Sequence, residues 1–116
     1  MAWHRVGAIE ASYRKPNWQP EGPLGWGFWV ESEPVDGGAP HGQLLAAVAA
    51  SFPTLDLTLS EADSSGNYLD GIIGWEGSEV ILWAERLEGI LYAWSLQQEP
   101  VERLRSEILR RAPAFF

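Results

Sequence analysis

Polar and apolar residues alternate in several short segments of the chain, a pattern typical of strands that bury one face. The clearest segment spans residues 55–61, where three leucines alternate with polar residues. Residues 25–31 and 68–75 show the same period with aromatic and β-branched side chains, so each predicts a strand. A weaker alternation over residues 3–13 predicts a further strand near the N-terminus.

Residues 79–97 are compatible with two structures. Their apolar residues fall on one helical face, which would suit a single long helix. Gly89, however, would destabilise a helix interior by about 1 kcal/mol. The β-type residues on both sides of this glycine favour a hairpin of two strands, 79–86 and 90–96, and we prefer this interpretation.

Two segments have helical periodicity instead. The apolar stripe of residues 43–52 is formed by Leu44, Leu45, Val48 and Phe52. The apolar stripe of residues 100–111 is formed by Val101, Leu104, Ile108 and Leu109. We therefore predict one α+β domain over residues 1–116, in which two helices cover one face of a mainly antiparallel sheet of about five to six strands.

The composition excludes several kinds of chemistry. The chain of 116 residues has no cysteine, so it holds no disulfide, thiolate metal site or catalytic thiol. It has two histidines, and it contains no phosphate loop and no nucleophile elbow. We expect a protein that is not an enzyme and that needs neither a cofactor nor a metal. No signal peptide or membrane-spanning run is recognisable, so we expect a cytoplasmic protein with no membrane partner.

The charges are segregated along the sequence. The net charge is −8, and eleven acidic residues but no lysine or arginine occur from Pro16 to Glu85. Such a segment is either a solvated acidic surface or a docking face for a basic partner. A surface that serves solubility usually mixes both signs, which favours the docking face. The same charge argues against direct binding of nucleic acid.

Tryptophan is the second unusual feature, with seven residues in the chain. Trp26, Trp83 and Trp94 fall within predicted strands and are expected to be buried. Trp29 shares a strand face with Glu31, so it is either an accessible binding residue or partly buried under a loop. An exposed tryptophan beside a carboxylate is typical of a binding hot spot.

The C-terminal half carries a resemblance to a known class of proteins. Residues 75–85 (WEGSEVILWAE), then residues 90–95 (ILYAWS) and a closing helix, are similar to the bacterial immunity proteins that neutralise polymorphic toxins. The resemblance implies a small acidic inhibitor that occupies the basic active-site cleft of a toxin, for instance a nuclease. We assign eight residues to its partner-binding site: Trp29, Glu31, Glu33, Asp36, Asp56, Glu61, Asp63 and Asp70.

Other functions fit the same composition. A phage-encoded nucleic-acid mimic, of the anti-CRISPR or anti-restriction type, would need carboxylates spaced like phosphates over a long surface. A small-molecule or sugar-binding domain would use exposed tryptophan and neighbouring carboxylates. An exposed aromatic sheet face would also allow the chain to form a homodimer.

Overall fold

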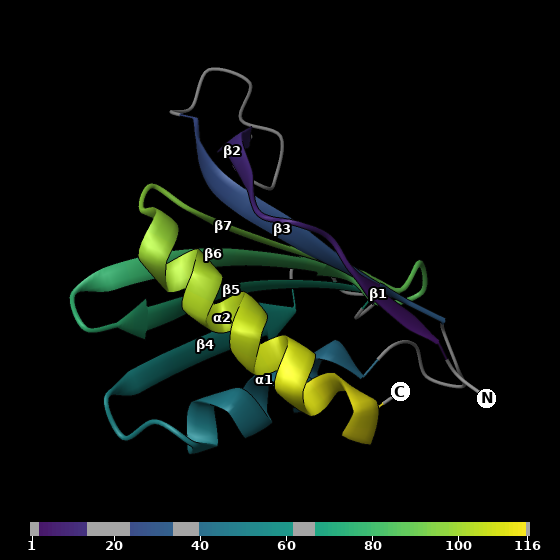
Figure 1. Cartoon of the computed structure of the whole chain (residues 1–116). Coiled ribbons are helices and arrows are strands. Elements are labelled where there is room, and N and C mark those ends of the chain that lie inside the picture. Colours follow the sequence, from purple (N-terminus) through teal and green to yellow (C-terminus); the bar gives the residue numbers. More distant parts are fainter. Residues whose placement is uncertain (1–2, 14–23, 34–39, 62–66, 116) are drawn as a thin grey trace.

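The computed structural model describes residues 3–13, 24–33, 40–61 and 67–115. They form two layers, a seven-stranded antiparallel sheet and two helices packed against one of its faces (Figure 1), which confirms the predicted α+β fold. The strands are β1 (His4–Val6), β2 (Glu10–Tyr13), β3 (Gly25–Ser32), β4 (Leu55–Glu61), β5 (Tyr68–Trp75), β6 (Ser78–Glu85) and β7 (Ile90–Ser95). The helices are α1 (His41–Ala50), α2 (Gln98–Arg111) and the short 3-10 helix η1 (Ala112–Ala114).

The order of the strands in the sheet is β1-β3-β7-β6-β5-β4, and β2 also pairs with β3. Strands β4 to β7 form a meander, while β1 and β2 pair with successive parts of β3 and share one edge. The single strand predicted over residues 3–13 is therefore wrong. The register shifts by one residue between Val6, which pairs with Val30, and Glu10, which pairs with Gly27. Residues 7–9, between these two positions, belong to no strand, so the segment forms β1 and β2 and the sheet has a seventh strand.

The hairpin predicted over residues 79–96 is confirmed. Strands β6 and β7 pair from Ile81 opposite Trp94 to Glu85 opposite Ile90. Gly89 in the connecting turn has φ 72°, a left-handed conformation that a helix interior would not allow. Its amide donates to the carbonyl oxygen of Glu85 at 2.9 Å, which closes the turn.

The core lies between the sheet and the two helices. The helices contribute Leu44, Leu45, Val48, Val101, Leu104 and Ile108, all of which are buried. Leu109 was predicted to join this stripe but is 43% exposed, because it is turned about 100° away from Ile108 on the helix. Trp75, which the sequence analysis did not place in the core, is only 3% exposed.

A buried polar pair joins α1 to β3 within this core. His41 and Ser32 are both fully buried, and the His41 Nε2 lies 3.3 Å from the Ser32 Oγ. Burial disfavours the charged imidazolium and lowers the pKa of His41 from 6.5 to about 4. The histidine is therefore neutral at physiological pH.

Gly25 allows β3 to lie close to the indole of Trp94. A Cβ at Gly25 would lie 2.8 Å from the Trp94 Nε1 and would overlap the carbonyl oxygen of Ser95. Because that oxygen belongs to the paired backbone, we expect Gly25→Ala to lower the free energy of unfolding by about 2–3 kcal/mol in urea titrations. Gly74→Ala is the matched control, since its Cβ would meet nothing nearer than the Asp56 Cβ at 3.8 Å. Equal losses in the two variants would contradict the explanation.

Candidate functional site on the open sheet face

Neither described helix covers the second face of the sheet (Figure 1). We call this the open face, and it consists of the strand residues that alternate with the core residues. Its members are Trp29, Glu31, Asp56, Thr58, Ser60, Tyr68, Asp70, Ile72, Glu79, Ile81, Trp83, Glu85, Ile90, Tyr92 and Trp94. The face is apolar at its centre, where Ile72 is 42% exposed.

The strand register assembles an aromatic row across the open face. Trp29 on β3 lies opposite Tyr92 on β7, and Tyr92 lies opposite Trp83 on β6. The Trp83 ring stacks on Tyr68 from β5, with centroids 5.6 Å apart and planes inclined by 28°. All four rings are half-buried, so part of each is accessible to a partner.

Trp29 is half-buried because it packs against Gly7. A Cβ at Gly7 would lie only 2.6 Å from the Trp29 Cε2, so the indole lies directly on the backbone at this point. The Gly7 amide also donates to the carbonyl oxygen of Trp29 at 2.8 Å. This contact fixes the ring at one end of the aromatic row.

Carboxylates surround the aromatic row. Glu31 forms an ion pair with Arg5 at 3.0 Å. Glu85 accepts a hydrogen bond from the Trp83 Nε1 at 3.4 Å. The pKa of Glu85 is raised, first by a hydrogen bond with Glu88 in the adjacent turn and then by desolvation. Within the described part of the chain, neither Glu85 nor Glu88 has an ion pair.

Tyr92 reports the resulting electrostatic potential. Its pKa is raised by burial and then by the charges of Glu85, Glu88 and Glu31. Three carboxylates therefore act on one phenol at the centre of the row. Burial and these charges together disfavour a phenolate, and the charges alone would attract a cation.

The structure distributes the eight predicted site residues unevenly. Four of them lie on the open face, namely Trp29, Glu31, Asp56 and Asp70. Glu33 follows β3 directly and is half-buried, with its amide bonded to the carbonyl oxygen of Trp3 at 2.9 Å. Glu61 is exposed but shares the side of β4 that carries the leucines, so it does not join the open face. Asp36 and Asp63 lie outside the described residues.

Sequence reasoning missed the centre of the site. Trp83 was expected in the core, and that prediction is wrong, because the ring lies half-buried on the open face. Trp26 is also half-buried, whereas Trp94 is 5% exposed and confirms its prediction. The available signal was that Glu79 and Glu85 alternate in phase with Trp83, which marks that side of β6 as the accessible one.

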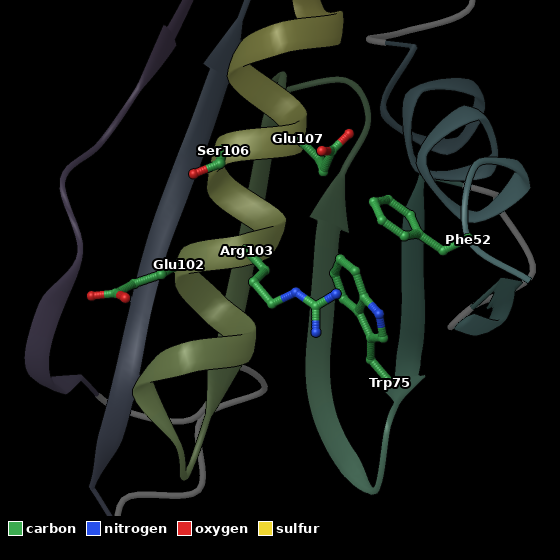
Figure 2. A pocket seen from close by; sticks show the side chains of 6 residues that line it. All are labelled: Phe52, Trp75, Glu102, Arg103, Ser106 and Glu107. Atoms are coloured by element: carbon green, nitrogen blue, oxygen red, sulfur yellow. The ribbon is translucent and has the colours of Figure 1, made fainter. Parts of the chain in front are cut away.

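A cavity lies on the helix side of the protein (Figure 2). It has a volume of about 360 Å³ and is lined by Phe52, Trp75, Glu102, Arg103, Ser106 and Glu107. The Arg103 guanidinium lies 4.1 Å from the centroid of the Trp75 ring and pairs with Glu76 at 3.0 Å. The face of the Trp75 indole is therefore in contact with Arg103 of the same chain.

Comparisons with protein-family models, curated proteins and solved structures found no match for this chain. Neither helix in the described ranges has the length and apolar character needed to cross a membrane. Across the same ranges, no three potential metal-ligating side chains lie together.

Proposed function

We propose that this protein is a small protein-binding inhibitor of the immunity type. In this proposal, the open face covers a basic surface of a toxin, such as the active-site cleft of a nuclease. One observation carries the proposal: the uncovered face of the sheet combines a half-exposed aromatic row with carboxylates, of which Glu31 alone has an ion pair among the described residues. Aromatic anchors supply contact area, and carboxylates select and attract a basic partner.

Two contacts within the chain support a binding mode for an arginine of the proposed partner. Arg103 stacks on Trp75 at 4.1 Å and pairs with Glu76, and Arg5 lies 5.4 Å from the centroid of Trp3 and pairs with Glu31. In both cases a guanidinium contacts an indole and a carboxylate together. Trp83 and Glu85 form a similar pair of an indole and a carboxylate. Among the described residues, Glu85 has no ion pair.

The arrangement of the open face favours this function over a nucleic-acid mimic. A mimic needs negative groups at regular phosphate spacing over a long surface. Here Ile72, Ile81 and Tyr92 separate the acidic residues and form an apolar centre. An apolar centre with a polar rim is typical of a protein interface.

Affinity capture followed by an inhibition assay tests the proposal. The tagged protein is expected to retain a basic partner at low salt, to release it as salt rises, and to inhibit that partner's activity when the two are mixed. Trp83→Ala is expected to lose the partner. Leu109→Ala, which truncates an exposed apolar residue on the helix side, is expected to keep it. Equal retention by both variants, or a captured protein whose activity is unaffected, would refute the proposal.

A further inference from the structure

The two edges of the sheet differ in how they are protected. The edge formed by β1 and β2 is interrupted and contains a register shift between Ala11 and Tyr13. At the other edge, β4 pairs with β5 without a break, from Leu55 opposite Trp75 to Glu61 opposite Leu69. Natural sheets usually block such an edge with a proline, a charged residue such as lysine, a bulge or a short strand. Strand β4 has no proline, lysine or bulge over its seven residues, and its two charged residues are Asp56 on the open face and Glu61 at the end of the strand.

The side chains on both faces of β4 would also suit a further strand next to it. Its three leucines, Leu55, Leu57 and Leu59, face the helix layer but are only half-buried. On the open face, Asp56, Thr58 and Ser60 are exposed. The apolar layer therefore ends at this edge with part of its surface uncovered, and no described strand pairs with the second side of β4.

We propose that β4 pairs antiparallel with β4 of a second copy of this chain, about a two-fold axis at Thr58. In this register Thr58 lies opposite Thr58 of the second copy, Leu57 opposite Leu59, and Asp56 opposite Ser60. It is the register in which all seven residues of each strand find a partner. This proposal does not rest on the proposed function, because the contact is formed by the edge strand β4 and the aromatic row takes no part in it.

Side-chain chemistry selects the register. Leu57 beside Leu59 of the second copy extends the apolar layer, and a threonine pair at the axis is favourable on a sheet surface. No carboxylate lies opposite another carboxylate. A slip by one residue would place the leucines of one copy beside the open face of the other. The slip is disfavoured because these leucines would then no longer extend the apolar layer.

The expected dimer is weak and responds to salt in a characteristic direction. A strand of seven residues is about 23 Å long, and a single pair of such strands buries less area than a standard interface. Each copy carries a net charge of −8, so the two copies repel each other at low salt. Salt should therefore strengthen this association, whereas it should weaken binding of a basic partner.

Analytical ultracentrifugation across a range of protein concentrations, at low and at high salt, tests the proposal. Wild-type protein is expected to form a reversible dimer whose population rises with both concentration and salt. Protein that stays monomeric at about 500 µM and high salt would overturn the proposal, because even a small interface should associate there.

Two lysine variants test the register. Thr58→Lys places two ammonium groups opposite each other at the axis and is expected to weaken the dimer at least about tenfold. Ser60→Lys places an ammonium opposite Asp56 of the second copy and is expected to strengthen it. Both sites are exposed on the same face of one strand. Within the monomer Ser60 lies opposite Asp70 and Thr58 lies opposite Ile72, so the free energy of unfolding of each variant is measured beside its dimer affinity. Equal changes in dimer affinity in the two lysine variants would overturn the proposed register. Loss of the dimer in Ile72→Ser would place the contact on the open face and overturn the proposal.

Discussion

Replacing Glu79 and Glu85 by lysine should weaken binding of the proposed basic partner by about 100-fold, or about 3 kcal/mol. Both glutamates lie on β6, on either side of Ile81 and Trp83 along the open face. The double variant exchanges attraction for repulsion next to the aromatic anchors, where partner groups are desolvated. Titration calorimetry or surface plasmon resonance with the captured partner measures the change.

The matched control is the double variant Glu99→Lys and Glu102→Lys. These two residues are exposed on α2, on the opposite side of the molecule, and their reversal changes the net charge by the same amount. We expect a loss of less than about tenfold that disappears at high salt, because only long-range attraction is reduced. If both double variants lose affinity equally at high salt, the open face is not the binding surface.

The buried His41 should make the protein less stable by about 3 kcal/mol at pH 4 than at neutral pH. The pKa of His41 is lowered from 6.5 to about 4 because burial disfavours its charged form. Between these two values the unfolded chain binds a proton that the folded chain does not. Acid therefore favours unfolding, and the contribution is complete above about pH 6.5 and lost as pH falls towards 4.

Chemical unfolding of the wild type and of His41→Gln at a series of pH values isolates this contribution. The stability of the wild type relative to the variant should be constant above about pH 7 and should fall by about 3 kcal/mol towards pH 4. If the variant does not fold, the imidazole of His41 can be titrated directly by NMR in the wild type. A histidine that becomes protonated near pH 6.5 in the folded protein would contradict the prediction.

The meander could be predicted from sequence because its local signals agree with the tertiary structure. Leu55, Leu57 and Leu59 alternate cleanly, and Gly89 marks a turn that a helix would not accept. The break between β1 and β2 could not be predicted, because it depends on the register against β3, a partner distant in the sequence.

The position of Trp83 at the centre of the site was not predicted, for a different reason. Strand β6 is apolar on both sides, since Val80 and Leu82 face the core while Ile81 and Trp83 face outward. A period of two gives the two sides, and only Glu79 and Glu85 at the ends of the strand mark the side that the helices leave uncovered. That choice is made by α2, which packs on β3, β6 and β7. Acidic residues were easier to place, because exposed carboxylates avoid the core.

The seam between β3 and β7 joins two parts of the chain that are far apart in sequence. Trp29 pairs across this seam with Tyr92, whereas the neighbouring contacts of β4 to β7 are formed by consecutive hairpins. Closing the long loop between these residues has a larger entropic cost than forming any of the hairpins. The aromatic row is therefore expected to be completed late in folding, after the meander. If the proposed function is correct, a newly synthesised chain would become competent to bind only once this long-range pairing is in place.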